Sequence, residues 1–403
     1  MNVEVQQAIE SLRLGIPPEG HIRYFTVGRL KEINTLTTTL QQPTSTALLL
    51  KANYGSGKSH LLKFIRETAL KEGYAVSSVT LDAKSAVRFN RMDQIFGAIC
   101  RGLEIPGVKQ KGIAPFFDWI SSQLKGGHVT NHWGQIANNN RWNYSKALKS
   151  PSIFIALRAW VSGRANTNLI EDWLHQAGGY KITDLDRELI RKPQISFRED
   201  LQANGPLQWS SYTTKASLFD FKHNVYSQSW HAIQDLDTLA RASKLRGLII
   251  LFDEFEDIVY NIRNIEHQKV AFQNLFQFFP GNLFTLSGNL FTGMSFFAIT
   301  PGFVEKCKHR LMMKGCWDYD YSYFDALQTF EMSPLEESHL QELAEKIRQF
   351  HGIAYDWDTN KLTVEKSLKH IVVKAASTPL QDRTRHTICE VVKCLDQLLE
   401  DDK

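Results

Sequence analysis

The stretch that decides the fold is Ala52-Asn53-Tyr54-Gly55-Ser56-Gly57-Lys58-Ser59. It has the spacing of a phosphate-binding loop, with alanine at the first position, where the strict pattern has glycine. In such a loop, successive backbone N–H groups surround an anion at the positive end of a helix. The motif therefore requires a strand before it and a helix after it.

The sequence supplies both neighbours. Residues 46–53 form a short, mostly apolar run that is typical of a strand buried on both faces. Residues 59–73 place apolar side chains at helical spacing and end in glycine. In this context Gly55 and Gly57 give the loop its backbone freedom, Lys58 can reach the β- and γ-phosphates, and the Ser59 hydroxyl can bind Mg²⁺. We therefore predict a site for ATP and Mg²⁺, whose cofactor-binding residues are Ala52, Asn53, Tyr54, Gly55, Ser56, Gly57, Lys58, Ser59 and His60.

A pair of acids supplies the second half of the predicted site. Residues 248–252 are an apolar run typical of a central parallel strand, and Asp253 and Glu254 follow directly. Ligands of open α/β sheets bind at this carboxyl end of the strands. We expect Asp253 to hold Mg²⁺ and Glu254 to orient and deprotonate the attacking water. The alternative is that the acids only cap the next helix. Glu256 and Asp257 are predicted to form a solvated first helical turn.

The sequence predicts three further strands. Residues 294–303 are apolar until Thr300, which precedes a Pro-Gly turn and is placed to contact the γ-phosphate or the water. Residues 75–82 and 329–335 are the other two. Five strands separated by helical patterns predict an α/β fold with a parallel sheet flanked by helices.

A large insertion separates the two halves of the site. About 200 residues lie between Lys58 and Asp253, roughly twice what a compact core needs. Seven of the nine tryptophans lie between Trp119 and Trp230, and residues 101–170 carry nine Lys or Arg against two acids. Basic and aromatic residues are interleaved in residues 131–149. Such a segment could bind double-stranded DNA, with the basic side chains on the phosphate backbone and the aromatic rings on the bases. The other interpretation is a small helical subdomain whose tryptophans form its own core.

The chain after residue 335 has apolar positions at helical spacing and predicts a small helical lid. Arg385 lies at the start of its last helix, where a guanidinium could reach the phosphates, and Arg383 is the competing choice.

The predicted division is 1–101 for the first part of the core, 102–229 for a mostly helical insertion, 230–335 for the second part of the core, and 336–403 for the lid.

Composition is consistent with a folded protein of more than one unit. The chain has 403 residues, 43% apolar and 22% charged, with a formal net charge of +4. Its five cysteines form no CxxC pair or zinc spacing, which favours reduced thiols. No uninterrupted apolar stretch approaches the length of a membrane span. We expect a cytoplasmic protein with no membrane partner.

Motifs along most of the chain resemble one known family. AIESLRLGIPP, FTVGRLKEI, YGSGKSHLL, RGLIILFDEFEDI, FFAITPGF, MSPL and DRTRHTICEVVKCLDQL occur in this order between residues 8 and 398. The set resembles the ATP-binding proteins of BREX phage-defence systems, in particular the BrxD-like proteins. These are similar to AAA+ ATPases of the initiator and STAND type.

The resemblance implies roles for particular residues. Arg29, in VGR, corresponds to the segment that borders the adenine. Thr300 falls at the sensor-1 position and Arg385 at the sensor-2 position. Arg310 is the candidate arginine finger, acting on the ATP of a neighbouring subunit.

The resemblance also implies an activity and partners. We expect an ATP-hydrolysing, P-loop AAA+ subunit that forms homo-oligomers and works with other defence-system proteins. Two rival functions remain open at this point. One is a DNA-loading ATPase of the initiator or transposition-regulator type, although only 18 residues follow Arg385, too few for an appended winged helix. The other is a signalling scaffold that binds ATP but barely hydrolyses it.

Overall fold

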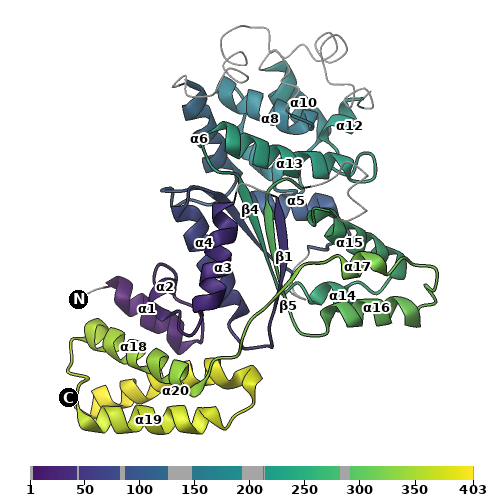
Figure 1. Ribbon diagram of the computed structural model, residues 1–403. Helices are drawn as coiled ribbons and strands as arrows, with labels where there is room; N and C mark the ends of the chain where they lie inside the picture. Colours follow the sequence, from purple (N-terminus) through teal and green to yellow (C-terminus); the bar gives the residue numbers. More distant parts are fainter. Residues whose placement is uncertain are drawn as a thin grey trace.

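A six-stranded sheet forms the centre of the protein (Figure 1). The computed structural model describes residues 3–42, 45–81, 87–125, 148–192, 212, 214–281 and 291–402. The strand order is β3-β2-β4-β5-β1-β6, and every neighbouring pair is parallel except β2 with β3. The strands are β1 (Thr46–Lys51), β2 (Ala75–Thr80), β3 (Leu103–Glu104), β4 (Leu248–Asp253), β5 (Met294–Ile299) and β6 (Thr329–Glu331). The predicted α/β class with a parallel sheet flanked by helices is confirmed.

The parallel register brings the ends of β1 and β4 to one edge of the sheet. β5 lies between these two strands, with Phe297 paired to Leu49 on one side and to Phe252 on the other. The Phe252 and Phe297 rings stack at 4.7 Å, a contact worth about 1 kcal/mol beyond the apolar area that it buries. The phosphate-binding loop after β1 and the acids after β4 therefore emerge on the same side.

Helices cover both faces of the sheet, because its strands are apolar on both sides. One face packs on α3 (Leu30–Gln41) and α4 (Lys58–Lys71). The opposite face packs on α5 (Met92–Arg101), α13 (Ser227–Ala242), α14 (Asp257–Asn261), α15 (Ile265–Phe278), α16 (Phe303–Met313) and α17 (Ser322–Asp325).

The predicted insertion, residues 102–229, is mostly helical where the structure describes it, although it begins with the edge strand β3 of the sheet. Its elements are α6 (Ile113–Lys125), α8 (Pro151–Ser162), α9 (Thr167–Leu174), α10 (Ile182–Asp186), the π-helical turn Arg187–Arg191 and α12 (Lys215–Phe219). Trp173 and Trp230 are fully buried, and the half-buried Trp119 and Trp160 donate their indole N–H groups to Ser243 and Asp118. These four tryptophans pack inside the protein, as the second interpretation expects, but the apolar core of the insertion is continuous with that of the sheet. Most of the basic, aromatic segment 131–149, including Lys146, lies outside the described residues.

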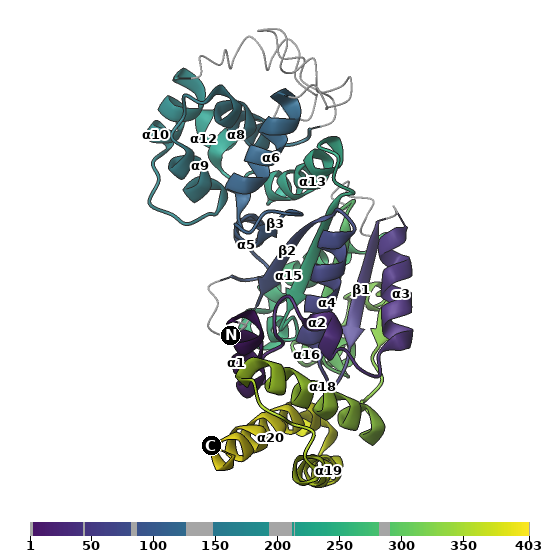
Figure 2. The same ribbon diagram turned by 90° about the vertical axis from the view of Figure 1, so that its left-hand side faces the viewer.

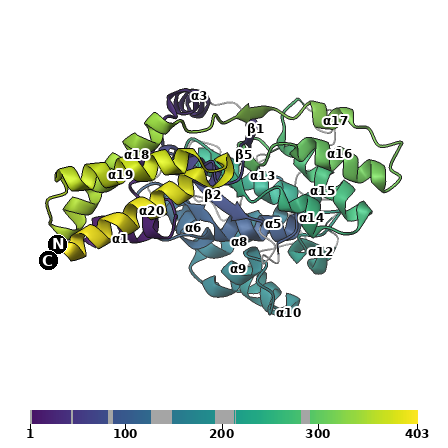
Figure 3. The same ribbon diagram turned by 90° about the horizontal axis from the view of Figure 1, so that it is seen from below.

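The lid predicted for residues 336–403 consists of three helices, and the first helix of the chain unexpectedly packs with them. These four helices are α18 (Glu337–Tyr355), α19 (Leu362–Ala376), α20 (Leu380–Asp401) and α1 (Val3–Arg13), while α2 (Ile22–Phe25) lies beside them. Figure 3 shows α1 next to α18 and α20. We expected α1 within the core segment 1–101, but its apolar stripe of Val5, Ala8, Ile9 and Leu12 packs on the lid.

Figures 1 and 2 place the insertion and the lid at opposite ends of the sheet. The edge carrying the phosphate-binding loop and the acids faces the lid, as the cavity described below shows. No described helix is both long and apolar enough to cross a bilayer.

Candidate nucleotide-binding site

The phosphate-binding loop has the backbone that its sequence predicts. Gly57 lies in the left-handed region at φ 90°, a conformation in which glycine avoids steric cost, and α4 starts at the next residue. No side chain caps this helix end, so the first-turn N–H groups face the open side of the loop. A helix of 14 residues places the positive end of its dipole here. The loop therefore suits a phosphate group.

Lys58 is held inside the loop. Its Nζ donates to the carbonyl oxygens of Ala52 at 3.2 Å and Asn53 at 3.4 Å, and lies 3.9 Å from Glu256. Burial lowers the pKa of Lys58, and the acids Glu256, Glu254 and Asp253 oppose that shift. A buried lysine that satisfies its donors on weak backbone acceptors is well placed to exchange them for phosphate oxygens.

The two acids after β4 lie at the same site, as predicted. Glu254 has φ 54°, a left-handed backbone that is costly for a residue with a Cβ, and such strain is common at functional sites. Its backbone N–H donates to Asp253 Oδ1 at 3.0 Å. Burial, and then the neighbouring acids Asp253 and Glu256, raise the pKa of Glu254. A carboxylate with a raised pKa is a stronger base than an ordinary glutamate.

The prediction for Glu256 is wrong. We expected a solvated side chain, but it is only 12% exposed and faces Lys58. Burial raises the pKa of Glu256, while Lys58 acts in the opposite direction. The short α14 turns this side chain inward because Phe255 and Ile258, on either side, are anchored in the core.

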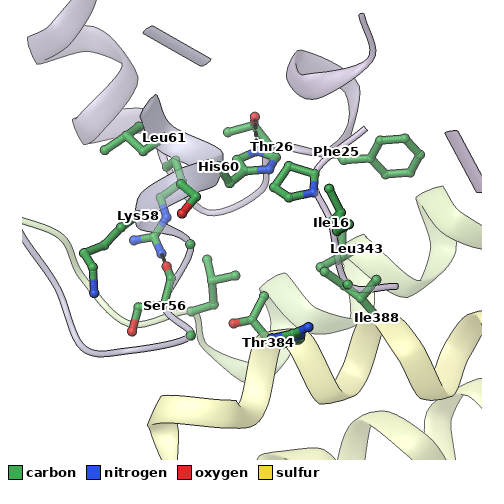
Figure 4. Close-up of a pocket in the computed structure, with 18 of the residues that line it drawn as sticks. Ile16, Phe25, Thr26, Ser56, Lys58, His60, Leu61, Leu343, Thr384 and Ile388 are labelled. Atoms are coloured by element: carbon green, nitrogen blue, oxygen red, sulfur yellow. Dashed lines mark hydrogen bonds between the residues drawn. The ribbon is translucent and has the colours of Figure 1, made fainter. Parts of the chain in front are cut away.

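A cavity of about 250 Å³ joins the loop, the acids and the lid. Figure 4 shows residues of the loop and the lid around it, with Lys58 and Ser56 on one side and Thr384 and Ile388 of α20 on the other. Between them lies an apolar wall of Leu12, Gly15, Ile16, Pro17, Pro18, Phe25, Val27, Leu335, Leu343 and Ile388. The cavity thus combines charged groups of the loop, the acids and Arg385 with a largely apolar wall.

His60 fixes one corner of this cavity. Its Nε2 lies 2.8 Å from Thr26 Oγ1, whose own hydrogen is donated to the Ile22 carbonyl (Figure 4). Because that hydroxyl hydrogen is already used, Nε2 must be the donor, which makes His60 the neutral Nε2–H tautomer. Burial lowers the pKa of His60 to about 4, and the charges of Arg29 and Lys63 add to this shift.

Arg29 lines the cavity, but its guanidinium is bound to protein groups. It donates to the Ser56 carbonyl at 2.9 Å, to Glu32 at 3.0 Å, and to the Ser333 carbonyl. Its role beside adenine stays a prediction.

The remaining predicted residues divide into two groups. Ser59, Asp253, Tyr54 and Arg385 line the cavity. Arg385 donates to the Leu14 carbonyl at 3.4 Å, whereas Arg383 donates to Thr378 within the lid, which favours Arg385 as the arginine nearest the cavity. The residues that do not line it are Ala52, Asn53, Thr300 and Arg310. Thr300 follows β5 at the same sheet edge, and Arg310 lies half-buried on α16.

The residues present fit ATP with Mg²⁺. The loop N–H groups and Lys58 suit phosphates, the apolar wall suits a base, and Ser59 with Asp253 offers two oxygen ligands. Among the described residues no cluster of three or more metal-binding side chains occurs.

Sequence reasoning missed much of the apolar wall. Leu12, Ile16, Leu343 and Ile388 come from three separate segments, and each looks like an ordinary apolar helix or loop residue. The available signal was the segment Gly15-Ile16-Pro17-Pro18, which is too rigid and too apolar for a plain surface connection.

Comparison with known proteins agrees with the resemblance noted from the motifs. Residues 2–125 match a family described as BREX system ATP-binding protein BrxC/D. No curated protein and no solved structure matches the chain. The matched range contains the phosphate-binding loop, Arg29 and His60, and ends before the acidic pair. Over residues 2–125, the chain is therefore similar to the BrxC/D family of BREX ATP-binding proteins.

Proposed function

We propose that this protein is the ATP-binding and Mg²⁺-dependent ATP-hydrolysing subunit of a BREX-type defence system, with a P-loop core of AAA+ type. One observation carries the proposal: the phosphate-binding loop, the acidic pair and the lid converge on a single cavity. The family description supports ATP as the nucleotide. We further propose that it acts in the cytoplasm, with other proteins of the same system.

Each residue has a defined task in this proposal. Lys58 and the N–H groups of residues 55–58 bind the phosphates, and the apolar wall holds the base. Ser59 and Asp253 would hold Mg²⁺, which when bound neutralises charge on the phosphates. Glu254 takes a proton from water, for which its raised pKa suits it. Arg385 adds positive charge from the lid, Thr300 orients the water, and Arg310 serves the site of a neighbouring subunit.

The test is ATP binding and turnover by the purified protein, with three variants. Lys58→Ala should lose ATP binding, because it removes the buried cation that faces the phosphates. Glu254→Gln should bind ATP and lose turnover by roughly 100-fold or more, since it removes only the base. Lys71→Ala, an exposed lysine in the last turn of the same helix, is the matched control and should match the wild type.

The outcomes separate binding from catalysis. ATP binding by Lys58→Ala that equals the wild type would disprove the assignment of the loop. Wild-type binding without turnover, with or without double-stranded DNA, would favour an ATP-dependent switch whose hydrolysis needs a protein partner. Turnover stimulated by DNA would favour a DNA-engaging ATPase.

A further inference from the structure

Arg29 and Glu32 form a buried bridge between the phosphate-binding loop and the lid. Arg29 donates to the Ser56 carbonyl in the loop and to the Ser333 carbonyl in the segment between β6 and α18. Glu32 accepts from Arg29 at 3.0 Å and from the Ser333 N–H at 3.1 Å. The two side chains are only 6% and 3% exposed. Residues far apart in sequence are thus held by one ion pair.

A second set of contacts follows the same route. Gly28, at φ 62°, lies so close to α18 that a Cβ built there would come within 2.5 Å of the His339 ring. His339 in turn accepts the Glu336 N–H at 3.2 Å, at the first turn of α18. On the other side of the same segment, Thr26 contacts His60 at the start of α4. Residues 26–32 therefore contact the loop helix and the lid together.

A buried ion pair is not by itself evidence of a stabilising role, because a well-packed apolar pair often serves as well. This pair, however, makes three bonds to backbone groups of two separate parts of the proposed ATP site, the loop and the segment that leads into the lid. The bond from Arg29 keeps the Ser56 carbonyl turned to the guanidinium, and a carbonyl turned instead toward bound phosphates would repel them. The other two bonds fix the position of Ser333, where the lid begins.

We propose that Arg29 and Glu32 are positioning residues that couple the state of the phosphate-binding loop to the position of the lid. The inference rests on the proposed ATP-binding function. A phosphate that reshapes the loop shifts the Ser56 carbonyl, and the rigid guanidinium passes this shift to Ser333 and α18. Lysine cannot replace it, because a single ammonium group lacks the planar fork that reaches both carbonyls at once.

The test is hydrogen exchange of the amides of residues 333–340, with and without the non-hydrolysable ATP analogue AMP-PNP and Mg²⁺. Wild-type protein should gain protection at these amides when the analogue binds. At analogue concentrations that saturate each protein, Arg29→Lys should lose this gain in protection, because lysine cannot bond both carbonyls. The control is Arg66→Lys, which alters another largely buried ion pair, with Glu104. This variant should keep the gain in protection at residues 333–340.

A second variant covers the case in which Arg29→Lys fails to fold. Ser333→Pro removes the N–H that Glu32 accepts, at an exposed position. It should also lose the nucleotide-dependent protection at residues 335–340 while binding the analogue normally. A wild-type protection change in either folded variant would overturn the coupling role. Absence of analogue binding by the wild type would instead overturn the proposed function, and this inference with it.

Discussion

The residues of the predicted nucleotide loop show how the placement of side chains around a cavity can be predicted from sequence. The glycines, Lys58, Ser59 and the acids after β4 were all predicted, because each depends on a short pattern and one adjacent element. Glu256 was not, since only tertiary packing of α14 shows that its side chain turns inward. The bond from Arg29 to Ser333 joins residues 304 positions apart, and no local pattern reports such a contact.

His60 predicts a pH dependence of stability. Its pKa is about 4 in the folded state and about 6.5 when unfolded, so the unfolded chain binds an extra proton between these values. This contribution to the free energy of unfolding is therefore complete above pH 6.5 and is lost as pH falls toward 4. Urea unfolding at pH 7.5 and pH 5.5 should show a drop of roughly 1 kcal/mol that is attributable to His60.

The matched variant for this measurement is His60→Asn, which keeps a donor for Thr26 but does not titrate. His231, on α13, also has a pKa lowered to about 4. It therefore lowers the free energy of unfolding of both proteins between pH 7.5 and pH 5.5. The wild type should consequently lose more stability than the variant between the two pH values. Equal losses would mean that His60 is not held neutral.

At the scale of elements, strand positions followed from the sequence more readily than helix partners. Apolar runs predicted β1, β4 and β5, because a strand buried on both faces has a distinctive composition. The sequence also predicted β2 and β6, although β6 is largely exposed. The two-residue β3 was missed, since a pair of residues carries no pattern. α1 was assigned to the core by its place in the chain, but an amphipathic stripe does not specify which apolar surface it meets.

The attachment of α1 to the lid predicts the effect of Arg13→Ala. Arg13 donates to Asp396 at 2.8 and 3.0 Å and to Tyr355 at 3.3 Å. Asp396 also contacts the buried His351 at 3.0 Å. Because Arg13 is partly exposed, we expect a loss of about 1 kcal/mol in unfolding free energy and faster hydrogen exchange in α1.

The control for this substitution is Lys369→Ala, which removes an exposed ion pair with Glu365 on α19. Such a pair contributes little, so the control should change stability by less than about 0.5 kcal/mol. Unchanged exchange in α1 of Arg13→Ala would show that apolar packing alone holds the helix on the lid.

For the whole molecule, the cavity between core and lid predicts stabilisation by ATP. The lid and the sheet have separate apolar clusters, and the cavity is lined from both sides. ATP at 100 times its Kd should stabilise the folded state by about 2.7 kcal/mol, seen as a higher Tm. Lys58→Ala should show no such rise, while Lys71→Ala should match the wild type. A rise in all three proteins would place ATP binding elsewhere.

The pairing of α1 with α20 also bears on how the protein is made. The Arg385 side chain reaches the Leu14 carbonyl, 371 positions away along the chain, and both residues border the cavity. At roughly 5–20 residues per second, about 20–70 s pass between the synthesis of the first wall of the cavity and that of the last. For most of that time the apolar stripe of α1 lacks its partner helices α18 and α20. A nascent chain on the ribosome therefore carries a phosphate-binding loop without an enclosed site, and the site closes only when translation has passed α20.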